Sequence, residues 1–201
     1  TSGQVTAAGS LTLTAGSGIT VASDLTLSQA AAPLVMSSGT AQNAVLTVAS
    51  SKTATTSNGM ILVTAFDVDF DGGLTTGTAP GHTMVLHGLS TLRDIGVGAA
   101  KQMQLADAEI ARISTSGLYV GSTNASNIDV SGVTAAGSNN IGGLFPIHAG
   151  GDGQVLPFLP CLLSPSDAAH DSIRIGLSGR RVRQKTRGTD NGGEEASAEA
   201  E

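Results

Sequence analysis

The sequence is poor in two kinds of side chain that usually build and coat a globular domain. Aromatic residues make up 2% of the 201 positions, with no Trp, and charged residues make up only 13%, well below the roughly 25% of an average globular protein. A core must then be assembled from Val, Leu, Ile and Ala in many thin layers. Stacked β-coils meet this condition, because each coil adds one or two aliphatic side chains to a continuous interior column.

Other absences exclude whole classes of protein. The single cysteine, Cys161, has no partner for an internal disulfide. No apolar run approaches the ~20 residues of a membrane-spanning helix. The net charge of −6 is spread along the chain, so we expect no nucleic-acid partner. The chain begins at Thr1 without a charged and then apolar leader, which we interpret as a piece of a longer protein whose signal peptide is absent or removed.

Short apolar–polar alternations predict β-strands in the first three quarters of the chain. Residues 66–73 (FDVDFDGG) alternate most regularly. Residues 60–65 (MILVTA) are continuously apolar, which predicts a strand that is covered on both faces or at least lies in a crowded rung. Residues 51–59 (SKTATTSNG) are polar and residues 74–82 (LTTGTAPGH) are rich in Gly, Thr and Pro, so both segments are expected to be loops. The turns leave no room for crossover helices, which disfavours a βαβ fold. Further strands are expected at Leu11–Thr14, Ile19–Ala22, Leu25–Ser28, Leu34–Ser37, Ala44–Val48 and Thr83–His87.

The most informative stretch is 101–141, where three short alternations are separated by Gly and Asn, residues that tolerate the positive φ of turns. Within it, residues 106–113 (ADAEIARI) form the chain's one candidate for a helical turn. We interpret this segment as part of a rung or a corner of a β-solenoid. Asp107 and Glu109 are expected to be solvated charges there.

The pattern changes after about Gly150. Four of the six prolines lie between Pro146 and Pro165, six of the ten basic residues lie from Arg174 onward, and the end is acidic and of low complexity. Such sequences bury too little apolar surface to order themselves. We therefore divide the chain into a β-solenoid repeat region at 1–150 and a weakly ordered tail at 151–201.

Residues 101–133 also resemble a repeat unit of very large secreted adhesins of the filamentous haemagglutinin type. In those repeats an E-(I/L)-x-R-I-(S/T) step leads into a GL-x-(I/V)-G strand and an I-x-V-x-G-(V/I) strand. The corresponding residues here are Glu109, Arg112, Ile113, Gly117, Leu118, Gly121, Ile128, Val130 and Gly132. The phrase LTLTAGSGITVASDLTLS at 11–28 is similar to the same class. The resemblance implies a right-handed parallel β-helix and a surface or extracellular role, and it brings no catalytic residues.

One phrase has the beginning of a calcium-binding loop. A D-x-D-x-D-G sequence is formed by Asp67, Asp69, Asp71 and Gly72, and calcium prefers several oxygen ligands on a tight turn. The twelfth position of such a loop is Thr78 instead of the bidentate Glu. The apolar residues that alternate with the aspartates are expected to face inward. We therefore expect the three aspartates to form the solvent face of a strand without metal.

The remaining motifs indicate little chemistry. The histidines are too scattered for a metal site, which usually needs two close pairs, and the common hydrolase, nucleotide-binding and zinc motifs are missing. Asn124 opens an N-glycosylation triplet on an expected turn. The Thr-x-Thr phrase at 12–14 invites an ice-binding interpretation, but its equivalents at 20–22, 26–28 and 47–49 lose the pattern. The strand preference of β-branched residues explains it more simply.

Together these features predict an all-β, right-handed parallel β-helix over 1–150 with an irregular C-terminal tail. We expect a structural or adhesive segment of a large secreted or cell-surface protein that acts through a long lateral surface, without enzymatic activity or cofactor. Its expected partners are neighbouring repeats of the parent chain, copies associated end to end, and cell-surface glycans or proteins. Two alternatives remain open. One is a polysaccharide-processing or polysaccharide-binding β-helix, which needs a lateral cluster of Asp, Arg or Lys, and the other is a trimeric viral or phage fibre.

Overall fold

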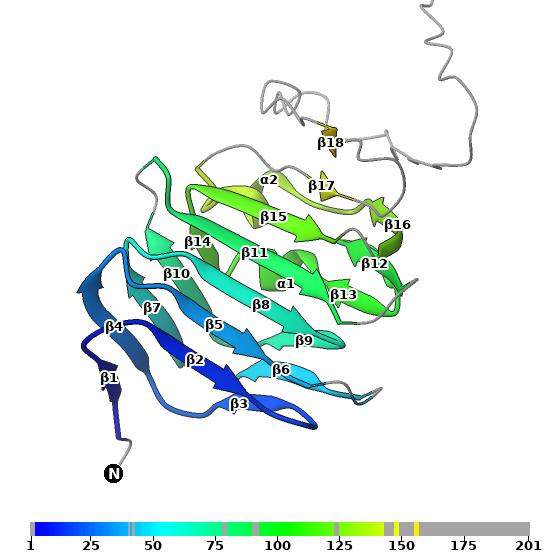
Figure 1. Cartoon of the computed structure of the whole chain (residues 1–201). Coiled ribbons are helices and arrows are strands. Elements are labelled where there is room, and N and C mark those ends of the chain that lie inside the picture. Colours follow the sequence, from blue (N-terminus) through cyan, green and yellow to red (C-terminus); the bar gives the residue numbers. More distant parts are fainter. Residues whose placement is uncertain are drawn as a thin grey trace, which may run out of the picture.

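The chain winds as a right-handed parallel β-helix, which confirms the predicted fold class (Figure 1). The computed structural model describes residues 3–39, 41, 43–77, 80–89, 93–122, 125–142, 147–148 and 155–156. Its strands are β1 (Val5–Ala7), β2 (Leu11–Thr14), β3 (Ile19–Val21), β4 (Leu25–Ala30), β5 (Leu34–Ser37), β6 (Val45–Val48), β7 (Thr53–Ser57), β8 (Ile61–Ala65), β9 (Asp67–Phe70), β10 (Gly73–Gly77), β11 (Thr83–Gly88), β12 (Arg93–Val97), β13 (Met103–Leu105), β14 (Ile113–Thr115), β15 (Gly117–Gly121), β16 (Ala125–Val130), β17 (Ile147–His148) and β18 (Val155–Leu156). Two helical turns are α1 (Asp107–Ile110) and α2 (Ala135–Ser138).

Four sheets form the walls of the solenoid. Sheet A has the order β1-β4-β7-β10-β14, sheet B β18-β17-β15-β11-β8-β5-β2, sheet C β3-β6-β9 and sheet D β13-β12-β16. In sheets A and C, and in sheet B from β2 to β15, neighbouring strands come from successive rungs of the coil. In sheet D the neighbours β12 and β13 instead follow one another along the chain within one rung. The paired named strands are parallel, except that β18 runs antiparallel to β17. Each rung from β1 to β15 therefore adds one strand to sheet A and one to sheet B, whereas sheet C takes strands from only the first three rungs and sheet D from the later ones.

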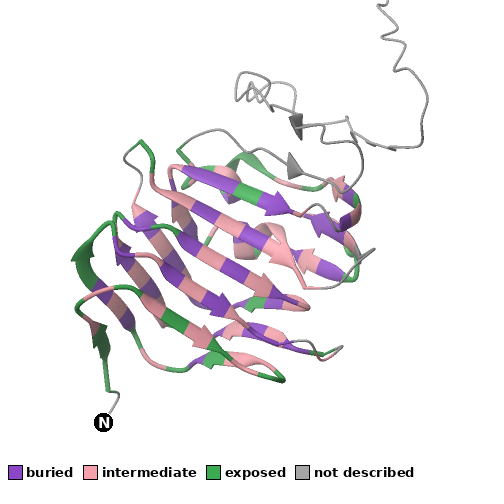
Figure 2. Cartoon of the chain, in the orientation of Figure 1, coloured by how far each residue is buried: buried purple, intermediate pink, exposed green. Residues whose placement is uncertain are grey.

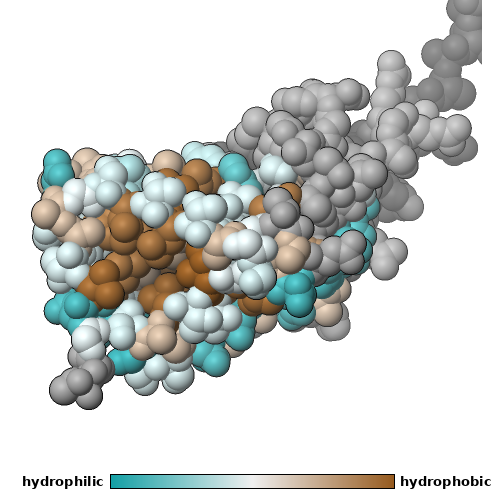
Figure 3. Space-filling view, turned by 60° about the horizontal axis from the view of Figure 1, so that its bottom comes forward, coloured by the Kyte–Doolittle hydropathy of each residue, from teal (hydrophilic) through white to brown (hydrophobic). Residues whose placement is uncertain are grey.

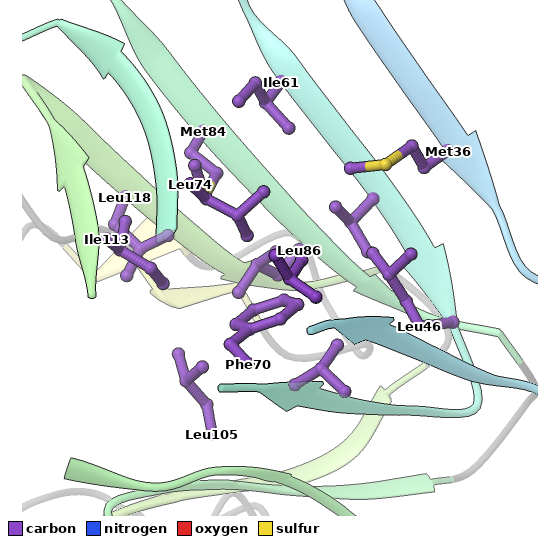
Figure 4. Close-up of a cluster of buried hydrophobic side chains, with 14 of the residues drawn as sticks. Met36, Leu46, Ile61, Phe70, Leu74, Met84, Leu86, Leu105, Ile113 and Leu118 are labelled. Atoms are coloured by element: carbon purple, nitrogen blue, oxygen red, sulfur yellow. The ribbon is translucent and has the colours of Figure 1, made fainter. Parts of the chain in front are cut away.

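The inward positions stay in register from rung to rung, although the rungs differ in length. In sheet B one inward position is occupied in turn by Leu11, Leu34, Ile61, Met84 and Leu118. Buried and partly exposed residues alternate along the strands, as Figure 2 shows. Side chains from the different walls meet in one core, in which Phe70 lies next to Leu86 and near Leu105 (Figure 4). Burying one such side chain stabilises the fold by about 1.5–3 kcal/mol.

Two strands of sheet A lie in segments that the sequence predicts to be loops. The predictions for 51–59 and 74–82 are wrong for β7 and β10, which occupy Thr53–Ser57 and Gly73–Gly77. Several inward positions of these strands hold Ala54, Thr56 and Thr76, so the alternation carries little hydrophobic contrast. The buried hydroxyls are satisfied internally. Thr56 Oγ1 donates to Gly59 O at 2.6 Å, and Thr76 Oγ1 lies 2.9 Å from the hydroxyl of Thr115.

The strand at 60–65 is not covered on both faces by described residues. β8 alternates between buried and intermediate positions, and Leu62 is one of the outward ones. Its outward neighbours in the sheet are Val35 and Val85. The continuous hydrophobicity of this segment therefore reflects lateral contacts between outward aliphatic side chains of adjacent rungs.

The segment 106–113 forms a corner, as interpreted, and the corner contains the helical turn α1. α2 lies against α1 from the next rung. Asp107 joins the two turns, because its Oδ1 accepts a hydrogen bond from Thr134 N at 2.9 Å and its Oδ2 accepts one from the Thr134 hydroxyl at 2.8 Å. Thr134 in turn caps α2 by accepting from Gly137 N at 3.0 Å. The expectation that Asp107 is merely solvated is therefore wrong.

Of the predicted tail at 151–201, only β18 lies within the described residues. Cys161 and the basic and acidic segments lie outside them. The division of the chain at about residue 150 stays a prediction.

Candidate functional site

The outer surface of sheet A carries one hydroxyl-bearing residue on every rung. Register pairs place five side chains in a single outward column: Thr6, Thr26, Thr55, Thr75 and Ser114. Thr6 is exposed and the others are half-buried by their neighbours along the column. Alternation explains their direction, because the residues on either side of Thr26, Leu25 and Leu27, are buried. We call this column the hydroxyl ladder.

The outer surface of sheet B differs in chemistry. The outward column through its centre consists of Thr12, Val35, Leu62, Val85 and Tyr119. Tyr119 is 40% exposed. This apolar column means that the lateral faces are not uniformly polar. Aliphatic and aromatic side chains on adjacent strands stabilise a sheet through cross-strand contacts, so a structural role accounts for the column.

The N-terminal end of the solenoid is open in the described structure. β1, β2 and β3 are end strands of sheets A, B and C. Figure 3, which brings this end of the molecule forward, shows an apolar area bordered by polar residues. Its side chains are partly buried against the core and include Ala7, Leu11, Leu13 and Ile19, while Val5 is 52% exposed. Unpaired strand edges and an exposed core end together form a template for a further rung.

The three aspartates of the D-x-D-x-D-G phrase do not play equivalent roles. Asp69 and Asp71 are exposed, as expected of the solvent face of β9. Asp67 is half-buried, and its Oδ1 accepts hydrogen bonds from Val68 N at 3.0 Å and from Gln104 N at 2.9 Å. Within the described part of the chain, no group of three or more His, Cys, Asp or Glu side chains is arranged to hold a metal ion.

Glu109 and Arg112 complete the backbone hydrogen bonding of Phe70, where sheet C ends. β9 is the last strand of that sheet, so one edge of it has no strand ladder. Phe70 N donates to Glu109 Oε1 at 2.8 Å, and the Arg112 guanidinium donates to Phe70 O at 2.6 Å. Together with Asp67, these side chains connect β9 to the next rung in place of backbone pairing. The E-x-x-R spacing of the repeat-like motif thus has a structural role here.

The environment of Glu109 disfavours its charge. Burial raises the pKa of this carboxyl above its usual value, and the charges of Asp69 and Asp67 raise it further, while hydrogen bonds from Phe70 and Ala106 act in the opposite direction. Glu109 is therefore not the solvated charge that the sequence suggests. Arg112 forms its ion pair with Asp71, at 3.8 Å, rather than with Glu109. Both partners of that pair are well exposed, so it contributes little.

None of the histidines in the described part of the chain belongs to a group of side chains that could hold a metal ion. The backbone oxygen of His82 accepts hydrogen bonds from Thr115 Oγ1 at 2.9 Å and from Ser116 Oγ at 2.6 Å, at the corner between sheets A and B. The Nδ1 atom of His82 is buried and has no hydrogen-bond partner among the described residues. His87 is on β11, in the outward column next to that of Tyr119. The predicted glycosylation site Asn124 lies outside the described residues, as does His170.

Comparisons of the chain with protein-family models, with curated proteins and with solved structures found no match. The resemblance to haemagglutinin-type repeats therefore stays an interpretation of the sequence pattern. None of the described helices is long and apolar enough to cross a membrane.

Sequence reasoning missed the hydroxyl ladder, which is the most regular surface feature of the solenoid. Its members stand 20 to 39 positions apart along the chain, at unequal intervals: the register pairs are Thr6↔Thr26, Thr26↔Thr55, Thr55↔Thr75 and Thr75↔Ser114. The local signal at this face is weak: residues 53–56 read TATT, in a segment that the sequence predicts to be a loop. The Thr-x-Thr phrase at 12–14 does not continue, because Thr12 pairs with Val35.

Proposed function

We propose that this chain is a structural and adhesive segment of a large secreted or cell-surface protein, which binds through its lateral faces and has no catalytic role. The observation that supports this most directly is the hydroxyl ladder, in which a hydrogen-bonding side chain recurs once per rung across the whole of sheet A. Repeated weak contacts gain strength from their number and need no pocket. The resemblance of residues 101–133 to haemagglutinin-type repeats supports the same assignment.

The open N-terminal end supports a second part of the proposal. Neighbouring rungs of a parent chain, or another copy of this chain, would cover the apolar end around Leu11, Leu13 and Ile19 and pair with the edges of β1, β2 and β3. A long rod built in this way multiplies its lateral contacts. No cofactor or metal is part of the proposal.

The alternative function is that of a polysaccharide-processing enzyme, and one observation in the structure favours it. Asp69, Asp71, Glu109 and Arg112 meet near one corner, as such an enzyme would need. However, Glu109 and Arg112 are engaged by the backbone of Phe70. Release of reducing ends from acidic and neutral polysaccharides by the purified chain would support this rival.

The proposal is tested by coupling the full chain to fluorescent beads at low and high density. Retention is measured on cultured epithelial cells and on insoluble cellulose and chitin. We expect retention to rise more steeply than in proportion to coupling density, because each contact is weak. The exposed Thr6→Ala variant should be retained almost as well as the unchanged chain. Complete loss of retention in this variant, or retention independent of density, would show a discrete site instead.

A further inference from the structure

We propose that the outer face of sheet A is an ice-binding face, with the hydroxyl ladder lying against the surface of an ice crystal. The inference rests on the proposed lateral-surface function and identifies one face and one partner for it. The ladder is formed by β1, β4, β7, β10 and β14, the complete set of strands in sheet A. Four of its five members are Thr and the fifth is Ser.

The spacing of the ladder is the first argument. Parallel strands lie about 4.7–4.9 Å apart, so the ladder repeats a hydroxyl and, at four rungs, a methyl group at that interval along the solenoid axis. This repeat is close to that of water oxygens along the surface rows of hexagonal ice. The hydrogen-bonded rungs fix the interval, so the array is ordered before it meets a crystal. Pre-organisation of this kind removes much of the entropy cost of binding.

The chemistry of the side chains is the second argument. A Thr hydroxyl both donates and accepts hydrogen bonds, as each water molecule in ice does. Because Thr is branched at Cβ, its χ1 angle is stiff, and the methyl group excludes loosely bound water beside the hydroxyl. The ladder contains no charged side chain, so it suits an uncharged partner that forms hydrogen bonds. It also contains no aromatic ring, which is the usual platform for stacking a sugar.

The restriction of this pattern to one face is the third argument. In sheet B the comparable outward column changes from Thr12 to aliphatic residues and Tyr119. In sheet C the outward column has Thr20 and Thr47 and then Asp69. A general preference of strands for β-branched residues would favour Thr on all the walls. A second outward column of sheet B has hydroxyls at Thr14, Ser37 and Thr64 but then reaches His87. Among the described strands, only the column in sheet A keeps a hydroxyl at every rung from β1 to β14.

The border of the ladder limits the size of the face. Asp24, which precedes β4, accepts a hydrogen bond from Thr53 N at 3.0 Å and so lies back against the sheet. On the other side of the ladder, the register of β4 and β7 shifts between Leu27 and Ala30. A second ordered column therefore does not extend across all rungs. Beside the ladder, Gln4 Nε2 donates to the hydroxyl of Thr26 at 3.2 Å, so this hydroxyl already has one partner within the chain. The contact is a single row of side chains, which suits inhibition of crystal growth by many adsorbed copies.

The test is ice recrystallisation inhibition by the purified 201-residue chain, measured in a frozen sucrose solution. The variant Thr55→Lys places a long charged side chain at the central rung, where it holds the neighbouring rungs away from a flat crystal. The matched control is Thr64→Lys, an outward position of β8 in sheet B. We expect the unchanged chain and Thr64→Lys to keep crystals small, and Thr55→Lys to lose most of this effect. Circular dichroism and melting temperature check that all three chains are folded.

Two outcomes would overturn the inference: no inhibition by the folded unchanged chain, or equal inhibition by the unchanged chain and Thr55→Lys. The conservative variant Thr55→Ser, which keeps the hydroxyl, should retain most of the effect. The bead experiment separates this inference from the proposed function. If beads are retained on cells, cellulose or chitin while the chain leaves ice unaffected, the lateral-surface function stands and sheet A has another partner or none.

Discussion

At the scale of single residues, close contact between rungs is the strictest demand that the fold makes on the sequence. Gly59 is buried just before β8, and a Cβ atom added there would overlap the backbone carbonyl of Ala32 in the previous rung. A Cβ atom added at Gly72 would likewise overlap the backbone carbonyl oxygens of Lys52 and Ala49. Glycine is required at both positions because the atoms that an added Cβ would meet include backbone carbonyl groups. Unlike the end of a flexible side chain, a backbone carbonyl cannot move aside without displacing its rung.

We therefore expect Gly59→Ala to destabilise the chain by about 1–3 kcal/mol or more, because the rungs must move apart to admit the methyl group. The measurement is urea unfolding followed by circular dichroism. Gly16→Ala is the matched control, since nothing lies within 4 Å of an added Cβ there. Equal stability of the two variants would contradict the close approach of the rungs at Ala32.

At the scale of the element, the sequence predicts a strand well where inward and outward residues differ in polarity. β2 and β5 have the predicted bounds, because Leu and Met alternate there with Thr, Val and Ser. β7 and β10 were missed because Thr occupies inward as well as outward positions, and the buried hydroxyls find partners only in the folded rung. The pairing of Thr76 with Thr115 joins residues 39 positions apart, so it cannot be predicted from the residues next to either one.

The sequence predicts where the corner at α1 lies, but it does not predict the hydrogen bonds that the corner makes. A helical turn could be recognised from the acidic residues at its start, Asp107 and Glu109. Their bonds to Thr134 and Phe70 join residues 27 and 39 positions apart. The hydroxyl ladder escaped prediction for the same reason, since register between rungs of unequal length is set by packing of the whole core.

Glu109 makes this corner sensitive to pH. Its pKa is raised in the folded chain, mainly by burial, relative to about 4.3 for an exposed Glu. Its contribution to stability is therefore fully present below the pKa of the unfolded chain and is lost as the pH rises through the higher folded pKa. In Glu109→Gln this dependence is absent, while one acceptor for Phe70 or Ala106 is lost at every pH. We expect the free energy of unfolding of the original chain, relative to the variant, to fall as the pH rises above the usual Glu pKa of about 4.3.

Urea titrations at a series of pH values would measure this difference. Asp107→Asn serves as the comparison, because Asp107 also bonds across rungs but faces Thr134 at the other side of α1. A constant difference between the original chain and Glu109→Gln from acid to neutral pH would show that the Glu109 carboxyl has the same pKa in the folded and unfolded chains.

At the scale of the whole molecule, the N-terminal end of the described solenoid offers strand edges to which another chain can add. The end strands β1, β2 and β3 present unpaired backbone groups around the apolar end shown in Figure 3. A second copy that stacks on this end would contribute a different surface from the one that it covers, so the contact is heterologous. A heterologous contact that forms no ring leaves a free end to which a further copy can add. Chains associated in this way would extend the rod, and with it the hydroxyl ladder, along one axis.

We expect the isolated chain to associate with increasing concentration, as measured by sedimentation velocity. Leu13→Lys should reduce this association, because Leu13 is a partly buried side chain of the open end and a charge there opposes the burial of the end by another copy. Thr12→Lys is the matched control, since Thr12 is on the same strand but points outward. A monomer at all concentrations, or equal association of both variants, would contradict end-to-end stacking. A fixed mass of three chains that neither substitution alters would favour the trimeric fibre instead.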